Sequence, residues 1–174
     1  MRELCEKAKQ GDAKAFAELY AQYAQKLYAT AFYLLGRKED AEDIVMDTVA
    51  DAFAQIRSLR NADAFGGWIF RILMNKLKRK RKEYALACEE ELFDTLPAVT
   101  GEPSAEHAAL RQAVAQLPQQ DREIVLLGVL GGYESAEIAQ ILGMNANTVR
   151  SRRMRTLAKL REMLTEGETT LAAK

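Results

Sequence analysis

The residues best suited to binding chemistry lie between Asn147 and Arg161, where six basic residues occur and no acidic one. If this stretch is helical, most of its polar side chains share one face or cluster at the helix start. Arginine and lysine bind phosphate, and arginine, asparagine and serine also bond to base edges in the major groove of duplex DNA. The candidate duplex-binding residues are therefore Asn147, Thr148, Arg150, Ser151, Arg152, Arg155 and Lys159.

A second basic stretch runs from Trp68 to Lys82, with seven basic residues and no acidic one. Residues 83–106 then carry seven acidic residues and no basic one, and the whole chain has a formal net charge of +0. Two separate basic patches offer two local sites for phosphate in spite of that balance. Taken singly, either patch is equally compatible with a solvated helix face.

Residue types that support catalysis are scarce. Cys5, Cys88 and His107 are the only cysteines and histidine, and none has a partner at metal-ligand spacing. We expect two free thiols and no disulfide, metal, cofactor or catalytic residue. No apolar run approaches the roughly 20 residues of a membrane span, and the start of the chain lacks a signal-peptide core. We therefore expect a cytoplasmic protein with no membrane insertion.

Capping residues and one glycine predict the elements that position the duplex-binding residues. Ser135 is suited to cap a helix over 136–142. Gly143 follows, where that helix must end in a left-handed conformation. Asn147 is suited to cap a second helix that begins at Thr148. Two helices joined by so short a turn cross steeply, as in a helix-turn-helix.

Small and apolar residues predict the packing inside this helix pair. Ala139 permits a close approach, and the angle between the helices is filled by Ile138, Leu142 and Val149. The inner side of the second helix is predicted to carry Val149, Leu157, Leu160 and Leu164. Arg153 falls on the same side, so either its stem reaches outward or Met154 replaces it in the packing. The alternative to DNA binding is an ordinary helical hairpin with a solvated basic face.

Apolar residues at three- and four-residue intervals predict three helices in the first half of the chain. The first spans Phe16 to Leu34 and ends near Gly36. The second begins near Lys38; its inner face is Ala41, Val45, Thr48, Ala52 and Ile56, and its opposite face is Asp40, Asp43, Asp47 and Asp51. The third begins near Ala62, continues into the basic stretch, and has an apolar face of Trp68, Ile69, Ile72, Leu73 and Leu77. We expect one small bundle.

The second half is predicted to hold a linker followed by helices. Residues 84–103 are acidic, have no sustained period and contain Pro97, Gly101 and Pro103. The sequence allows a short helix there, over 92–96. Ser104 is suited to cap the next helix, and Pro118 to start a buried helix that ends at Gly131 and Gly132.

The predicted fold class is all-α, with two small helical domains joined by an acidic linker, the C-terminal one a helix-turn-helix. The domains cover residues 1–83 and 104–168, the linker covers 84–103, and a short tail covers 169–174.

In this order, the motifs resemble the extracytoplasmic-function class of bacterial RNA polymerase sigma factors. The resemblance covers roughly residues 10–82 and 104–164. Its first half rests on FAELYAQYAQKLY, LGRKEDAEDIVMDTVADAF and FGGWIFRILMNKLKRKRK, and its second half on LPQQDREIVLL and the helix-turn-helix. Many regulators contain a helix-turn-helix, whereas its combination with DAEDIV and F-x-x-W-I-x-x-I-x-x-N is far more specific.

The resemblance implies that the helix around residues 40–53 docks on the clamp helices of the polymerase's largest subunit. The matching residues are Asp40, Asp43, Met46, Asp47, Val49 and Phe53. Met46 stands where the family usually has glutamine, and Val49 where it usually has phenylalanine. An acidic face suits a basic partner, although the same face without the resemblance is interpreted as solvated.

The resemblance also implies that residues 57–65 hold an unpaired base of the minus-ten promoter element and that the next helix lies along the separating strands. Basic side chains and base pockets bind single strands in general. The matching residues are Arg57, Arg60, Asn61, Phe65, Trp68, Arg71, Asn75, Lys76 and Arg79. We interpret Trp68 as a core residue in preference to a stacking platform, because it continues the apolar face with Ile72.

In the same resemblance, the C-terminal domain reads the minus-thirty-five element as duplex, chiefly through residues 147–155. The acidic linker either threads toward the polymerase's RNA path or is a flexible tether. An anti-sigma factor is a further partner common in this class.

The predicted function is promoter recognition without catalysis. The chain binds core RNA polymerase, places two DNA-reading domains at a fixed spacing and helps to melt promoter DNA. The runner-up is a dimeric helix-turn-helix regulator, but no heptad seam or self-complementary patch favours it. The third alternative, an enzyme acting on melted DNA, requires a phosphate-binding loop, metal ligands or a nucleophile–base pair that this sequence lacks.

Overall fold

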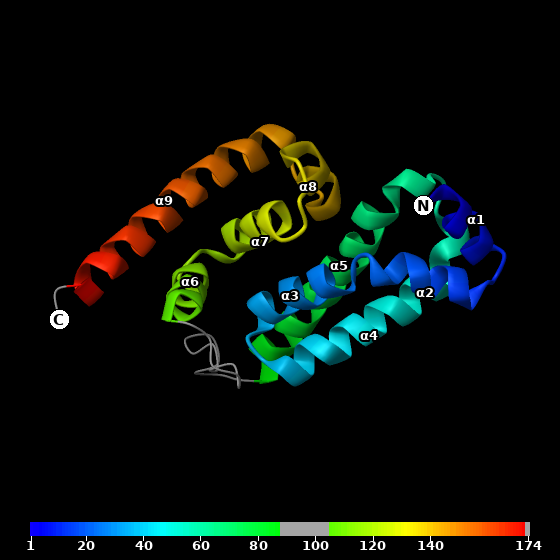
Figure 1. Ribbon diagram of the computed structural model, residues 1–174, viewed down its shortest axis with the longest axis horizontal. Helices are drawn as coiled ribbons and strands as arrows, with labels where there is room; N and C mark the ends of the chain where they lie inside the picture. Colours follow the sequence, from blue (N-terminus) through cyan, green and yellow to red (C-terminus); the bar gives the residue numbers. More distant parts are fainter. Residues whose placement is uncertain (88–104, 173–174) are drawn as a thin grey trace.

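The computed structural model describes residues 1–87 and 105–172 (Figure 1), and within those ranges every regular element is helical, as predicted. The N-terminal half contains α1 (Arg2–Lys9), α2 (Ala13–Ala21), α3 (Ala24–Leu35), α4 (Lys38–Gln55), short 3₁₀ turns at Ile56–Ser58 and Ala62–Ala64, and α5 (Phe65–Ala87). The C-terminal half contains α6 (Ala105–Ala115), α7 (Gln119–Val129), α8 (Ser135–Leu142) and α9 (Ala146–Ala172). Outside the described residues lie Cys88, the predicted cap Ser104 and the helix expected over 92–96.

The first predicted helix is in fact two helices, α2 and α3, separated at Gln22 and Tyr23. The apolar spacing continues across the break, so the periodicity alone predicts a single helix. The break lets the Tyr23 ring pack against the ring of Phe65, with centroids 5.6 Å apart. Helix α1, which lies against α2 and carries the free, buried thiol of Cys5, is not predicted by the sequence pattern.

The acidic helix α4 begins at Lys38, as predicted, after Gly36 ends α3 in a left-handed conformation with φ 74°. Its inner face also matches the prediction, since the buried residues include Ala41, Val45, Thr48, Ala52 and, in the following turn, Ile56. The Thr48 hydroxyl donates to the Ile44 carbonyl at 2.7 Å, which satisfies it inside the core. The acidic side chains of α4 are therefore turned away from the core.

Helix α5 starts at Phe65 and not near Ala62. Asn61 Oδ1 accepts from the Asp63 N–H at 3.0 Å, and this bond holds a 3₁₀ turn in front of the helix. At its other end α5 continues to Ala87, through residues 84–87 of the predicted linker.

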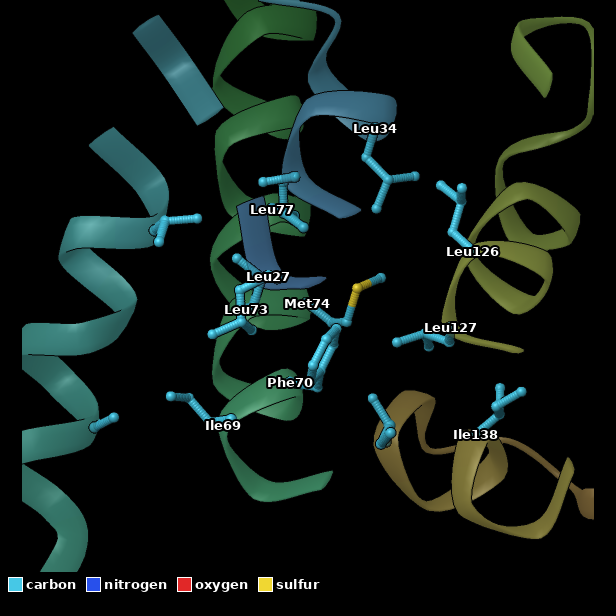
Figure 2. Packing of buried hydrophobic residues seen from close by; sticks show 14 of the residues in the cluster. Leu27, Leu34, Ile69, Phe70, Leu73, Met74, Leu77, Leu126, Leu127 and Ile138 are labelled. Atoms are coloured by element: carbon cyan, nitrogen blue, oxygen red, sulfur yellow. The ribbon is translucent and has the colours of Figure 1, made fainter. Parts of the chain in front are cut away.

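The helices of the two halves share one core. Helix α5 lies against α3 and α4 on one side and against α8 on the other. Figure 2 shows Phe70 and Met74 on the side of α5 that faces the C-terminal helices, opposite Leu127 and Ile138, and all four are buried. Helix α7 follows Pro118, as predicted, and is buried over Ile124–Leu127. No helix in the described part of the chain combines the length and apolarity that a membrane span requires.

Gly143→Ala is expected to lower the free energy of unfolding by about 1–2 kcal/mol, because a Cβ is strained in the left-handed region. Gly143 has φ 67°, and nothing lies within 4 Å of the place of an added Cβ, so the cost is conformational and not steric. Gly143→Asn is the matched control, since asparagine tolerates this conformation better. Urea unfolding followed by circular dichroism measures both; equal losses would contradict the explanation.

Candidate nucleic-acid interface

Helix α8 is capped one residue earlier than the sequence predicts. The cap is Glu134 and not Ser135: the Glu134 N–H donates to the Glu137 carboxylate at 2.8 Å, and the Glu134 side chain in turn accepts from the backbone of Glu137. This reciprocal arrangement satisfies two backbone donors at the helix start. Ser135 becomes the first helical residue.

Helix α9 is capped by Asn145 and not by Asn147, which corrects a second prediction. Asn145 Oδ1 accepts from the backbone N–H groups of Asn147 at 2.9 Å and Thr148 at 3.4 Å. The helix consequently begins at Ala146, and the exposed Asn147 side chain is not used for capping. Asn147 therefore points a free amide outward from the first turn, where a groove-binding helix meets base edges.

The contact between α8 and α9 is largely as predicted. Ile138 and Val149 are fully buried, and Ala139 is buried beside them. The prediction is wrong for Leu157, which is 39% exposed, because Thr156 takes the inner position instead. The inner side of α9 is thus spaced as Val149, Arg153, Thr156 and Leu160.

The contacts of Arg153 decide whether this residue or Met154 takes part in the packing of α9. Its guanidinium lies beside Gly128, where an added Cβ would come within 3.0 Å of it, and Nη1 donates to the Tyr133 carbonyl at 3.3 Å. Met154 is 69% exposed and takes no part in the packing. Arg153 therefore has a structural role, because its guanidinium joins α9 to Gly128 near the end of α7 and to the turn that precedes α8.

The candidate duplex-binding residues lie together on the outer face of α9. Those that are exposed are Asn147, Thr148, Arg150, Ser151, Arg155 and Lys159. Arg152 differs, because its Nη1 lies 3.0 Å from Oδ1 of Asp121 in the first turn of α7. Sequence reasoning missed Asp121, since no local pattern indicates a partner 31 positions away.

The candidate strand-binding residues divide into two groups. Those exposed to solvent are Arg57, Arg60, Asn61, Arg71, Asn75 and Arg79. Phe65 is fully buried against the rings of Phe16, Tyr23 and Trp68, so it supports the loop from below and presents no surface to DNA, contrary to its assignment from the sequence. Lys76 is mostly buried and lies 2.7 Å from Asp51 of α4.

A cleft of about 720 Å³ separates the strand-binding residues from α8. One wall contains Asn61, Trp68 and Arg71, and the other contains Glu137 and Gln140. Trp68 is half-buried and packs against the core, as interpreted from the sequence, and one side of it also lines this cleft. Tyr133 also lines the cleft, and burial raises the pKa of its hydroxyl far above the usual value, so the group stays neutral.

The candidate polymerase-binding face lies on α4. Asp43, Met46 and Asp47 are exposed there, while Val49 is half-buried. Phe53 is partly exposed, and its ring meets the ring of Phe16 edge to face at 5.1 Å. Asp40 is less accessible, since its side chain is only 14% exposed, and Arg37 at 3.3 Å and Lys80 at 3.8 Å offset its charge.

An apolar groove of about 380 Å³ between α3, α6, α7 and α9 was not foreseen from the sequence. Its lining includes Tyr33, Leu110, Val129, Leu157 and Leu164. The signal available in the sequence is Val129, which ends a helix that is apolar nearly all round yet remains 62% exposed. Among the residues whose placement is described, no group of His, Cys, Asp or Glu is arranged to hold a metal ion.

Comparison with known proteins identifies both halves of the chain. Residues 19–85 match the family described as Sigma-70 region 2, and residues 107–160 match Sigma-70, region 4. The chain is 34% identical to the ECF RNA polymerase sigma factor BldN of Streptomyces coelicolor over 92% of this chain and 65% of BldN. It is 30% identical to the RNA polymerase sigma factor NccH of Alcaligenes xylosoxydans xylosoxydans over 95% of each chain.

The fold agrees with these matches. The solved structure of CnrH in complex with the cytosolic domain of CnrY has a TM-score of 0.71 and 26% identity, over 95% of this chain and 97% of that one. The chain therefore belongs to the extracytoplasmic-function class of bacterial RNA polymerase sigma factors. It spans just under two thirds of BldN and nearly the whole of NccH.

Arg152→Ala is expected to weaken binding to promoter duplex by about 1–3 kcal/mol, and by different amounts on different sequences, if Arg152 reads a base. Fluorescence anisotropy with a panel of duplexes measures this. An equal loss on every sequence would reduce Arg152 to a phosphate contact.

Asp121→Asn provides the matched test of its ion pair. Because the pair is only partly buried, its removal is expected to tighten duplex binding by roughly twofold to fivefold, as Arg152 no longer has to leave a carboxylate. The gain should vanish when Arg152→Ala is also present. A similar gain in both backgrounds would mean that Asp121 acts only through the net charge.

Proposed function

We propose that this chain binds core RNA polymerase, directs it to specific promoters and helps to melt promoter DNA at the start of transcription. The observation that carries the proposal is that an acidic α4 face, a basic α5 face and a basic α9 face occur in one chain whose two halves match sigma regions 2 and 4. Each of these three faces is proposed to bind a partner, and none is proposed to catalyse a reaction. Since its partner is the polymerase, the site of action is the cytoplasm.

The α4 face is proposed to dock on the clamp helices of the largest polymerase subunit. Exposed carboxylates at Asp43 and Asp47 lie one turn apart, with exposed Met46 beside them. An acidic face with an apolar neighbour fits a basic helical partner, because opposite charges orient the encounter and apolar burial holds the complex.

The outer face of α5 is proposed to follow the separating strand of the minus-ten element. Arg71, Asn75 and Arg79 are exposed and spaced four residues apart, so they form one line along the helix. A line of cations and an amide suits a phosphate backbone, and the adjoining loop at Arg60 and Asn61 offers polar groups for an unstacked base. The α9 face is proposed to read the minus-thirty-five element as duplex.

The proposal is tested by transcription from a supercoiled genomic library with purified core polymerase, with and without the protein. Discrete start sites that share two spaced upstream elements would establish an initiation factor. If no start site depends on the protein while the protein alone still shifts duplex DNA, a conventional helix-turn-helix regulator becomes the better account.

Asp43→Lys with Asp47→Lys is expected to abolish polymerase binding, since it reverses the charge of the proposed docking face while both positions remain exposed. The matched control is Glu3→Lys with Glu6→Lys, which makes the same change of net charge on α1. Co-purification with core polymerase reports binding, and circular dichroism reports folding. Normal polymerase binding by the α4 variant would remove the docking assignment.

The apolar groove is proposed to receive an amphipathic helix of an anti-sigma factor, a class of partner common in this class of sigma factors; the similar protein CnrH is solved in complex with the cytosolic domain of CnrY. The groove is lined mainly by aliphatic side chains from the C-terminal helices. Val129→Asp places a charge at its most exposed apolar position and is expected to release such a partner. A promoter reporter in the source cells should then rise above its wild-type level; unchanged or lower output would argue against the groove.

A further inference from the structure

Helix α1 packs against the segment that leads into α5. It lies against α2 and against both 3₁₀ turns (Figure 1). Its buried side chains, Cys5 and Ala8, are small, so the helix approaches these turns closely. The 59–61 loop joins the two turns and carries the exposed residues Arg60 and Asn61. These two polar residues are thus presented to solvent above a packed layer to which α1 belongs.

The first turn of α1 is joined to the second 3₁₀ turn by an ion pair. Arg2 Nε donates to Oδ1 and Oδ2 of Asp63 at 3.1 and 3.2 Å, and Arg2 Nη2 donates to Oδ2 at 2.5 Å. A contact through two nitrogens fixes the orientation of both planar groups. Because both side chains are exposed, the pair contributes little to the stability of the fold, and its main consequence is geometric.

The other end of α1 is joined to the first 3₁₀ turn. Arg57 Nε donates to the Lys9 carbonyl at 3.2 Å. Lys9 is the last residue of α1, where carbonyl groups lack partners within the helix and carry partial negative charge, so a guanidinium there is favourable. The 59–61 loop is therefore attached to α1 on both flanks, by Arg57 before it and by Asp63 after it.

These attachments act on the amide of Asn61. The Asp63 backbone N–H donates to Asn61 Oδ1 at 3.0 Å, so the amide oxygen is engaged inside the turn. The NH₂ group of an amide has two donor hydrogens and no acceptor. With its oxygen held in the turn, the exposed Asn61 side chain is left with this NH₂ group for a ligand. An unstacked nucleobase meets such a group with an acceptor atom, which is a ring nitrogen or a carbonyl oxygen.

We propose that α1 is a positioning element for strand recognition, in which Arg2 and Arg57 hold the 59–61 loop so that the Asn61 NH₂ group meets an acceptor atom of an unstacked base. The inference rests on the proposed strand-binding function. Asp63 links the two ends of the argument, since its carboxylate is held by Arg2 and its N–H holds Asn61. Without these bonds the loop samples other orientations, and the protein distinguishes less well among the four bases at that position.

Strand binding by the holoenzyme tests this proposal. The probe is a fluorescent single-stranded oligonucleotide with the minus-ten element found in the transcription assay, together with versions that carry each other base at every position of the element. Asn61→Ser keeps a side-chain oxygen for the turn and removes the NH₂ group, so it identifies the position that Asn61 reads. Arg2→Glu is expected to reduce the preference among bases at that same position by roughly twofold to fivefold, the range that an exposed ion pair supplies.

A charge swap and a matched control accompany this variant. Adding Asp63→Arg to Arg2→Glu restores an opposite-charge pair and should recover the preference, which separates positioning from a loss of folding. Lys7→Glu is the control, because it makes the same change of net charge and its partner Glu3 lies on α1 itself. Co-purification with core polymerase should be unchanged in every variant.

Arg57→Leu tests the second attachment and should reduce the preference at the same position. An equal loss on every oligonucleotide would make Arg57 a phosphate contact only. A preference that survives in Arg2→Glu, or that Asp63→Arg fails to recover, would overturn the positioning role of Arg2. A loss at a position other than the one lost in Asn61→Ser would overturn the link through Asn61. If the wild-type holoenzyme shows no base preference at all, the proposed strand recognition itself fails, and this inference with it.

Discussion

Helix α5 has three sides in different environments, and the arrangement of the other helices depends on it. One side enters the N-terminal bundle through Ile69, Leu73 and Leu77, all fully buried. A second side, with Phe70 and Met74, is buried against the C-terminal helices. Only the remaining strip stays in water, and it carries Arg71, Asn75 and Arg79. Since uncovered apolar surface costs roughly 25 cal/mol per Å², the burial of Phe70 and Met74 stabilises the contact between the two halves.

Local pairing of charges is the second constraint on function. The chain has equal numbers of basic and acidic residues, 25 of each, and several cations near the proposed DNA surfaces lie beside carboxylates. Lys76 is 2.7 Å from Asp51, and Arg152 is 3.0 Å from Asp121. For these side chains, DNA binding exchanges one anion for another, so each contributes less affinity than a cation that starts fully solvated. The preference of the protein for particular DNA sequences then depends more on the geometry of these contacts than on the total charge of the protein.

The sequence predicts well what is local and periodic. The start of α4, its buried face, and the left-handed Gly36 and Gly143 follow from spacing and backbone preference alone. The predicted helix caps are wrong by one or two positions, because neighbouring polar residues compete for the same capping role. Only the path of the backbone selects Glu134 over Ser135. The second buried side of α5 and the pairing of Arg152 depend on contacts distant in sequence, which no local pattern encodes. A helix start with Phe65, Trp68, Ile69, Phe70, Ile72, Leu73 and Met74 is nevertheless apolar nearly all round, and such helices are buried on more than one side.

The proposed binding surfaces differ in how accessible they are in this structure. Helix α4 packs against α2, α3 and α5, and it lies on the side of the N-terminal bundle away from α7, α8 and α9 (Figure 1). The proposed polymerase-binding residues Asp43 and Asp47 are therefore exposed, whereas Asn61, Trp68 and Arg71 line a cleft that α8 also lines. The proposed polymerase contact on α4 therefore needs no change in the packing of α5, whereas a nucleic acid strand that enters the cleft must fit between the residues of α5 and those of α8.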